Sequence, residues 1–385
     1  MMVFLPPNVV QYAVLLFTMS FLSWAHIQRL FADGDPRQQS VDITAPLMIQ
    51  TQKLSSIAFN FYDGTVLSSG KELRIESHKT HAIKSRPKLL PFFSYLMCFQ
   101  NSMVGPFVFF TDYLNFIEGR EEDQVSDPTE RDYVMNHKDE IRNPKGVLKT
   151  HFITFVFHFV LALYASGRYE PTYLISDEFQ RLGIFRKYFW LTLYGFYLRQ
   201  KFYCAWTLSA LAMLVSGFGF SGFSSSSTGA LEPEYRNAIN FRFWGCEVNS
   251  WNLGTVRWLR ECVYVRAPKR HAVVSVFLVS AFWHGFYPVY YLCFLSAALV
   301  TMTGRLCRAR LRPCFLKSYW HHRLYDVLTS LSALFCLNYL GCAFALLDAS
   351  MTLKFWGTAS YFTFYWPISP LGVMPQQLAC SPDYC

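Results

Sequence analysis

The apolar run FLVSAFWHGFYPVYYLCFLSAALV, at positions 277–300, limits what this chain can fold into. As a helix it is long enough to cross about 30 Å of hydrocarbon, which takes roughly 20 residues. Yet a titratable side chain, His284, lies inside it. The ring nitrogens of a histidine need hydrogen-bond partners, so His284 must face protein or a water-filled cavity. It is either a functional residue or a structural hydrogen-bonding group, and intramembrane ionisable residues favour function.

The remainder of the chain also has the composition of a membrane protein. Of its 385 residues, 52% are hydrophobic, 18% aromatic and only 16% charged, which is too apolar for a soluble globular protein of this length. The net charge of +9 comes from Lys and Arg in short loops, as is usual beside anionic lipid headgroups. No compact basic cluster with interleaved aromatic residues indicates a nucleic-acid partner. The composition therefore predicts a multi-pass integral membrane protein.

The cysteines do not indicate a metal site. The chain has 11 of them, many inside apolar runs, without a CxxC pair or a Cys/His ligand spacing. We interpret them as small buried hydrophobic residues. The terminal CSPDYC, residues 380–385, is compatible with a disulfide that faces the lumen and equally with a reduced tail.

Apolar segments of about 20 residues recur along the chain and predict about eight to ten membrane segments. No internal repeat is visible, so we expect one all-α helical domain over residues 1–385. The predicted segments cover residues 10–25, 45–60, 89–117, 152–166, 188–198, 203–223, 273–303, 327–347 and 353–373. The first is a span or a membrane-edge helix, with a signal peptide as the weaker interpretation, and 45–60 is either an interfacial helix or a tightly packed span.

Two of these segments carry interruptions. In the segment 89–117, the pair Gly105 and Pro106 is typical of a broken or re-entrant helix, whose freed backbone groups must be satisfied by neighbouring protein. In the segment 273–303, Pro288 removes a backbone hydrogen bond and favours a kinked or interrupted helix that lines a cavity. The charged stretch 118–149 is expected to be loop-like.

A second polar feature lies upstream in FRFWGCEVNSWNLGTVRWLRECVYVR, residues 241–266. Asn252 lies there between Trp251 and Leu253, and Trp258 follows at close to helical spacing. A lone Asn in such a place is most often the N-cap of a helix. A role in chemistry becomes the alternative once the downstream histidine is considered with it.

Together, the blocks around Asn252 and His284 resemble the membrane-bound O-acyltransferase (MBOAT) superfamily. WNLGTVRWLRECVYVR, residues 251–266, is similar to the family block WN-x-x-T-x-x-WL-x-x-x-x-Y-x-R. SAFWHGFYPVYYLCF, residues 280–294, is similar to the family block SA-x-WHG-x-YP-x-YY-x-x-F. The resemblance covers about residues 40–350 and includes MIQTQKLSSIAFNFYDG (48–64), FYCAWTLSALAMLVSGFGFSG (202–222) and the stretch 87–119.

The TQK, FIEG and WHGFYP elements point to the lysophospholipid acyltransferase branch. Members of that branch usually carry more membrane segments before the TQK element, so residues 1–40 are expected to be an abbreviated N-terminal portion and 374–385 a tail. The stretch NFRFWGCEVNSWN departs from the acidic and serine-rich pattern of the family. The motif of the sterol and diacylglycerol branch, FYxDWWN, is absent.

The resemblance implies acyl transfer from acyl-CoA to the free sn-2 hydroxyl of a lysophospholipid. An alcohol is a poor nucleophile until a base removes its proton, and a buried neutral histidine, with an unperturbed pKa near 6.5, suits that step. We assign His284 as the general base. Asn252 either donates to the oxyanion or holds the imidazole or hydroxyl in line. Because the thioester is already activated, no metal and no further cofactor are expected beside acyl-CoA as co-substrate.

The lysophospholipid and its acylated product both reside in the bilayer, so the resemblance also implies an intramembrane reaction chamber. Trp251, Trp283 and Tyr287 are predicted to wall it, with plain helix packing as an equal alternative. Basic residues of the same region, Arg257 and Arg266 among them, are candidates for contact with phosphates of CoA or lipid. A positive-inside topology signal explains them as well.

Other functions compete with this interpretation. A transporter or channel also has intramembrane histidines and Gly-Pro breaks, but it has no reason to carry the two family blocks. Acylation of a protein or a neutral lipid, and a catalytically silent scaffold, are the alternatives within the family. The endoplasmic reticulum membrane is the expected location. Headgroup, acyl-chain preference, topology and oligomeric state are left open by the sequence.

Overall fold

The structure is a computed structural model that describes residues 5–31, 43–225, 230–241, 250–316 and 318–358. These residues are helical apart from loops and one two-stranded antiparallel hairpin, which confirms the predicted all-α class. In that hairpin Phe223 pairs with Pro233 and Ser225 with Leu231. The terminal CSPDYC and most of the predicted segment 353–373 lie outside the described residues.

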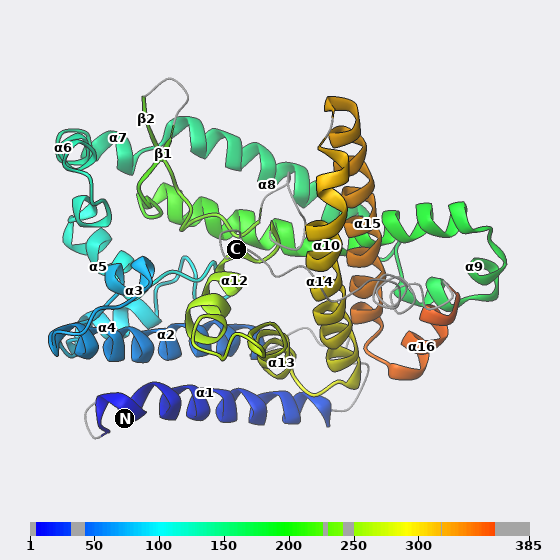
Figure 1. Cartoon of the computed structure of the whole chain (residues 1–385), viewed down its shortest axis with the longest axis horizontal. Coiled ribbons are helices and arrows are strands. Elements are labelled where there is room, and N and C mark those ends of the chain that lie inside the picture. The colour runs from blue at the N-terminus through cyan, green and yellow to red at the C-terminus, as the bar shows by residue number, and fades with distance from the viewer. Residues whose placement is uncertain (1–4, 32–42, 226–229, 242–249, 317, 359–385) are drawn as a thin grey trace.

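In the N-terminal half, two long helices lie side by side and short helices follow (Figure 1). The elements are α1 (Pro7–Leu30), α2 (Thr44–Ser68), α3 (Glu76–Thr80), α4 (Leu89–Leu96), α5 (Phe110–Glu118), the 3-10 helix η1 (Glu121–Gln124), α6 (Pro128–Asn136), α7 (Lys138–Arg142) and α8 (Lys145–Ala165). The first two predicted segments, 10–25 and 45–60, are confirmed as helices and are longer than predicted.

The C-terminal half contains the longest helices. Figure 1 shows α14 and α15 as a pair that crosses the direction of α1 and α2, with α12 and α13 on one side of the pair and α9 on the other. The elements are the 3-10 helix η2 (Pro171–Ile175), α9 (Asp177–Arg181), α10 (Ile184–Val215), β1 (Phe223–Ser225), β2 (Leu231–Pro233), α12 (Leu253–Leu259), the π-helix η3 (Arg260–Tyr264), α13 (Ala272–His284), α14 (Pro288–Phe315), α15 (Tyr319–Leu346) and α16 (Ala349–Thr358).

The predicted break in the segment 89–117 is confirmed. Helix α4 ends at Leu96 and α5 begins at Phe110, and the chain between them is not helical. Its carbonyl groups find partners on the helices around it, as burial requires. The hydroxyl of Tyr95 on α4 donates to the carbonyl of Val108 (2.7 Å), and the hydroxyl of Ser209 on α10 donates to the carbonyl of Gln100 (2.5 Å).

Two predicted segments, 188–198 and 203–223, form a single helix, so the prediction of two spans is wrong. Two of the polar residues between them, Arg199 and Gln200, are bonded to neighbouring helices and do not break α10. Nδ1 of His158 on α8 donates to Oε1 of Gln200 (2.8 Å), and Arg199 donates to Asn338 on α15 (2.5 Å). Residues 199–202 include no proline or glycine, and α10 continues to Val215.

The expectation of a loop over residues 118–149 is also wrong. Short helices occupy it, and the sequence contains the signal for one of them. Asp127 is the N-cap of α6, where its carboxylate accepts from the backbone N–H groups of Thr129 (2.8 Å) and Glu130 (3.1 Å). Pro128 follows at the first helical position, where its fixed φ and missing N–H suit a helix start.

Four helices of the described chain are long and apolar enough to cross a membrane: Pro7–Leu30, Lys138–Ala165, Pro288–Phe315 and Tyr319–Leu346. In the second of these only 6% of the most apolar window is buried inside the protein, so its side chains need lipid around them. Helix α13 is also apolar, but its 13 residues are fewer than a helical span of the hydrocarbon requires. These helices confirm a multi-pass membrane protein, while the expected eight to ten segments stay a prediction.

The fold depends on a close approach at Gly64 of α2, which gives the first prediction. A Cβ at this position would lie 2.0 Å from the carbonyl oxygen of Ile83, whose own N–H donates to the carbonyl of Asn60 (2.9 Å). Gly64→Ala gains about 1 kcal/mol of helix propensity but must displace backbone, so we expect a net loss of about 1–3 kcal/mol. Thermal unfolding of the detergent-solubilised protein measures this.

The control is Gly304→Ala on α14, where an added Cβ meets nothing within 4 Å. It gains the same propensity without the overlap, so its melting temperature should equal or exceed that of the wild type. Equal melting of both variants would contradict the close approach of α2 to Ile83.

Candidate active site

His284 lies at a break between two helices. It is the last residue of α13, and α14 begins four positions later at Pro288, which confirms the predicted interruption. Gly285 ends α13 with a φ of 121°, a conformation that favours glycine. A Cβ on Gly285 would also lie 3.0 Å from the ring of His26. The chain therefore turns sharply beside the imidazole and has no room for a larger residue there.

Aromatic rings hold the imidazole of His284. Phe294 stacks on it, with ring centroids 5.0 Å apart and an interplanar angle of 25°. Phe344 and Tyr290 contribute rings at 5.3 Å and 5.9 Å. The side chain is half-buried, and within the described residues neither ring nitrogen makes a hydrogen bond. The structure therefore gives no support to a purely structural hydrogen-bonding role.

A second histidine, His26 near the end of α1, supports the same helix end. Its Nε2 lies 3.0 Å from the carbonyl oxygen of Trp283, and the side chain is 5% exposed. Because a carbonyl only accepts, Nε2 carries the proton and donates. The last carbonyl groups of a helix have no partner within it, so this bond stabilises the end of α13. Sequence analysis missed His26, although a polar residue at the end of an apolar segment is the available signal.

Asn252 adopts a left-handed backbone conformation, with φ 49° and ψ 56°, immediately before α12. This region is sparsely populated, and Asn tolerates it better than most residues. Asn252 occupies the N-cap position but makes no capping hydrogen bond with its side chain, so the N-cap interpretation is wrong. The capping is done by Asn240, whose backbone carbonyl accepts from the N–H of Leu253 (2.8 Å) and whose Oδ1 accepts from the N–H of Gly254 (2.8 Å).

Asn240 also fixes the amide of Asn252. Its Nδ2 donates to Oδ1 of Asn252 at 3.2 Å. The carboxamide of Asn252 therefore uses its oxygen as an acceptor, and in the described part of the chain its Nδ2 donates to no residue. An amide held in this way presents N–H groups rather than an oxygen to a neighbouring molecule.

Asn252 and His284 do not hydrogen-bond one another. Their helices meet through two tryptophans, because the ring of Trp258 lies 5.9 Å from the ring of Trp283. Both indoles are anchored on α2: Trp258 donates to Oγ of Ser55 (2.9 Å) and Trp283 to the carbonyl of Met48 (3.0 Å). Helix α2 thus positions the start of α12 and the end of α13.

The three residues predicted to wall a chamber lie in different surroundings. Trp251 packs on α10, with its ring 4.8 Å from that of Trp206. Trp283 is 3% exposed and belongs to the same buried cluster as Trp258. Tyr287 is half-buried in front of α14, and its ring lies 5.6 Å from that of Tyr290 beside His284. Their contacts fit helix packing, and contact with a substrate stays a prediction.

Two segments of the family resemblance, 48–64 and 251–266, lie side by side and are joined by hydrogen bonds at regular positions. Gln52 donates to the hydroxyl of Thr255 (2.8 Å), Trp258 donates to Ser55, and Arg266 donates to both carboxylate oxygens of Asp63 (3.0 and 2.6 Å). Each pair is separated by 203 positions, so α2 and the α12–η3 segment run in the same direction. The polar residues of segment 48–64 are therefore hydrogen-bond partners of residues in segment 251–266.

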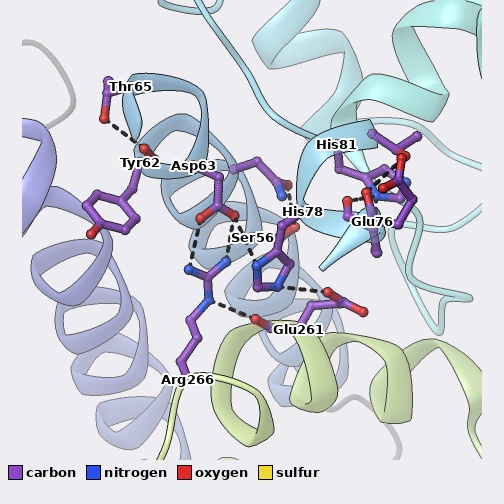
Figure 2. A network of polar contacts seen from close by, with 12 residues as sticks. Ser56, Tyr62, Asp63, Thr65, Glu76, His78, His81, Glu261 and Arg266 are labelled. Atoms are coloured by element: carbon purple, nitrogen blue, oxygen red, sulfur yellow. Dashed lines mark hydrogen bonds and ion pairs between the residues drawn. The ribbon is translucent and has the colours of Figure 1, made fainter. Parts of the chain in front are cut away.

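Asp63 and Arg266 are part of a buried ionic network (Figure 2). His78 lies between the two acidic residues of that network, with Nε2 3.0 Å from Glu261 and Nδ1 4.0 Å from Asp63. Burial raises the pKa of Glu261, but the hydrogen bond and charge of His78 outweigh it and leave that pKa below its ordinary value. Arg266 thus meets a carboxylate inside the fold, which does not favour the predicted contact with a phosphate.

A second ion pair joins His81 to Asp112 on α5, with Nε2 and Oδ1 3.3 Å apart. His81 also stacks on Phe109, with ring centroids 3.8 Å apart. Asn237 donates to Asp112 (3.1 Å) and accepts from Arg257 (2.7 Å), so the second arginine that was a candidate for phosphate contact is also bonded within the fold. This pair fixes the loop after α3 against the re-entrant segment.

Comparison with known proteins assigns the chain to a family. Residues 8–346 match the model of the MBOAT, membrane-bound O-acyltransferase family. Lysophospholipid acyltransferase 6 of Drosophila melanogaster is 33% identical over 368 residues, which cover 93% of this chain and 49% of that protein.

Two further relatives of lower identity are matched over a larger share of their own length. Membrane-bound glycerophospholipid O-acyltransferase 2 of Mus musculus is 28% identical and is matched over 91% of this chain and 68% of its own length. The lysophospholipid acyltransferase of Schizosaccharomyces pombe is 30% identical, over 83% of this chain and 64% of its own length. The chain thus spans about half to two thirds of the length of the curated relatives it matches.

The pair of His81 and Asp112 predicts a pH dependence of stability. Burial lowers the pKa of His81, but the carboxylate of Asp112 outweighs burial and raises that pKa above 6.5. Burial raises the pKa of Asp112, but His81 outweighs burial and lowers that pKa below 3.8. A raised histidine pKa stabilises the fold fully below the ordinary histidine pKa, and this contribution is lost as the pH rises through the raised value. The lowered carboxyl pKa gives a contribution that is lost only in acid.

Asp112→Asn should therefore cost most stability at about pH 5–6 and less at about pH 8–9. The measurement is the difference in melting temperature between wild type and variant across that range. Asp132→Asn, at an exposed position of α6, serves as the control and should show a small difference that does not change with pH. A constant loss for Asp112→Asn would show that the ion pair does not stabilise the fold.

Proposed function

This chain belongs to the membrane-bound O-acyltransferase family, and on that premise we propose that it transfers a fatty acyl chain from acyl-CoA to the free sn-2 hydroxyl of a lysophospholipid. The observation that carries the proposal is the imidazole of His284, which is held between aromatic rings at a helix break while its nitrogens make no hydrogen bond within the described chain. Such a group is ready to accept a proton from a substrate hydroxyl.

The reaction would begin at the hydroxyl of the lysophospholipid. A neutral ring nitrogen of His284 takes the hydroxyl proton as the oxygen attacks the thioester carbonyl of acyl-CoA. The resulting tetrahedral intermediate carries its negative charge on the former carbonyl oxygen. When the carbon–sulfur bond breaks, the thiolate of CoA leaves and takes the proton from the imidazolium. The imidazole is then neutral again, and the product is a diacyl phospholipid.

Asn252 is proposed to stabilise the oxyanion. Of the two roles considered for it, the contact with Asn240 favours this one, because the amide oxygen already accepts a hydrogen bond (3.2 Å) and the N–H groups are left to donate. Its fixed left-handed backbone adds to this, since a pre-set donor needs no reorganisation during the reaction.

The relatives named as acyltransferases of lysophospholipids and glycerophospholipids support the substrate class. The endoplasmic reticulum membrane is the proposed location. The indole-mediated contact between α12 and α13 supports a shared site, because it ties the segments of Asn252 and His284 to one helix. Transfer to a protein or a neutral lipid is a possible outcome of the test.

The test is an acylation assay on the purified full chain in proteoliposomes. Lysophospholipids with choline, ethanolamine, serine and inositol headgroups are offered with saturated and unsaturated acyl-CoAs, and diacyl product is measured. His284→Ala should lower turnover by about 10²–10⁴-fold. Asn252→Ala should lower it by about 10²–10³-fold. His137→Ala, an exposed histidine on another part of the chain, is the control.

Near wild-type turnover in His284→Ala would contradict the assignment of the base. Product from a neutral lipid or a protein, with none from any lysophospholipid, would contradict the acceptor.

His26 is proposed as a positioning residue for His284. His26→Ala removes the donor to the Trp283 carbonyl and should lower kcat about tenfold with little change in KM, because the imidazole is less well placed while substrate contacts persist. His26→Gln restores an N–H donor and should recover most of the loss. Gln28→Ala, an exposed neighbour on α1, is the control. Equal losses for His26→Ala and His26→Gln would show that the hydrogen bond is not the cause.

A further inference from the structure

Asn240 makes three hydrogen bonds to the start of α12, and the capping of that helix needs only two of them. Its backbone carbonyl accepts from the N–H of Leu253 and its Oδ1 from the N–H of Gly254, both at 2.8 Å. These two bonds satisfy backbone groups that the first turn of a helix leaves without a partner. The third bond runs from Nδ2 to Oδ1 of Asn252 (3.2 Å) and joins two side chains. It therefore has a role other than helix capping.

The oxygen and nitrogen ends of both carboxamides follow from this arrangement. A backbone N–H can only donate, so the atom of Asn240 that faces Gly254 is its oxygen. The other end of that amide is an NH2 group, which can only donate, so the atom of Asn252 that faces it is an oxygen. The opposite orientation of Asn252 places two NH2 groups against each other and loses the hydrogen bond. The backbone of Gly254 thus determines the orientation of two side chains in succession.

The side chain of Asn240 is closely surrounded. It is 2% exposed. A Cβ added to Gly254 would lie 3.1 Å from Oδ1 of Asn240 and 2.5 Å from the backbone nitrogen of Phe107, so the first turn of α12 lies close to both. Asn252 is only half-buried. Its amide is therefore more accessible to a substrate than the amide that holds it.

We infer that Asn240 is a positioning residue that sets which end of the Asn252 carboxamide meets the substrate. With the oxygen of Asn252 held by Asn240, its N–H groups are the end left for the carbonyl oxygen of the acyl donor. Turned by half a rotation, the same amide presents its oxygen, which repels the negative charge of the tetrahedral intermediate. The inference rests on the proposed function, because it assigns a support to the residue proposed to stabilise the oxyanion.

Asn240→Asp is the main test, because a carboxylate keeps the bond to Gly254 and inverts the bond to Asn252. Both oxygens of a carboxylate only accept, so the amide of Asn252 must turn to donate to it and then presents its own oxygen to the substrate. We expect kcat for diacyl phospholipid to fall about 10²–10³-fold, as in Asn252→Ala, with KM changed less than about threefold. The measurement is the acylation assay in proteoliposomes at about pH 7–8, where a carboxylate is ionised.

Asn240→Ala separates this role from a structural one. It removes the bond to Gly254 and leaves the amide of Asn252 free to adopt both orientations, so kcat should fall only about two- to tenfold. Its melting temperature should fall further than that of Asn240→Asp, because Asp caps a helix as well as Asn does and Ala caps it poorly. The two variants should thus rank in opposite order in activity and in stability, and the same order in both measurements would overturn the inference.

A double-mutant cycle shows whether Asn240 acts through Asn252. On the Asn252→Ala background, Asn240→Asp has no amide to turn and should change kcat by less than about twofold. Asn101→Asp is the matched control, because Asn101 is 1% exposed and its Oδ1 accepts from Nζ of Lys53 (2.7 Å). A carboxylate there keeps the bond to Lys53, so kcat should stay at the wild-type value.

A wild-type kcat in Asn240→Asp would overturn the inference, as would an equal loss in the presence and absence of the Asn252 amide. A wild type that forms no diacyl phospholipid would contradict the proposed function instead. The melting temperature then tests the contact: the loss in the double variant Asn240→Ala, Asn252→Ala should be smaller than the sum of the two single losses, because each single variant breaks the same bond. Additive losses would overturn the inference as well.

Discussion

The described structure depends on the polar groups that α2 buries and that only other protein segments can satisfy. Gln52, Lys53 and Asp63 are almost fully enclosed. A buried polar group without a partner costs about 1–3 kcal/mol, and more if it is charged. Each of these side chains therefore requires a particular neighbour: Thr255 for Gln52, Tyr95 and Asn101 for Lys53, and Arg266 for Asp63. These requirements join the re-entrant segment and the α12–η3 segment to one helix.

The same helix determines where the candidate reaction residues lie. Trp258 and Trp283 each donate an indole N–H to α2, and they contact one another. Asn252 immediately precedes α12, which contains Trp258, and His284 directly follows Trp283 at the end of α13. Both candidates lie at helix ends, where the backbone departs from helical geometry and a side chain is less covered by its own helix. The buried packing centres on α2, whereas the candidate reaction residues Asn252 and His284 lie at the start of α12 and the end of α13.

Much of the fold was predictable, and the errors have physical causes. Apolar length and the Gly-Pro pair predicted α1, the broken segment around Pro106 and the interruption at Pro288, because lipid leaves few conformations for such sequences. Helix α10 was divided wrongly because Arg199 and Gln200 look like a loop in isolation. Their partners, Asn338 and His158, are distant in sequence. Helix α6 was missed although Asp127 and Pro128 mark its start, so there the signal was present and was not used.

The sequence by itself determined the membrane character and the two family blocks, and it made Asn252 and His284 the candidate reaction residues, because apolar length and motif spacing are properties of the chain order. Only the tertiary structure decided that Asn240 rather than Asn252 caps α12, that His26 supports the end of α13, and that Arg266 meets Asp63. Each of these contacts joins residues from different segments. A hydrogen bond depends on distance and direction in space, and the order of residues along the chain does not specify these until the segments have packed.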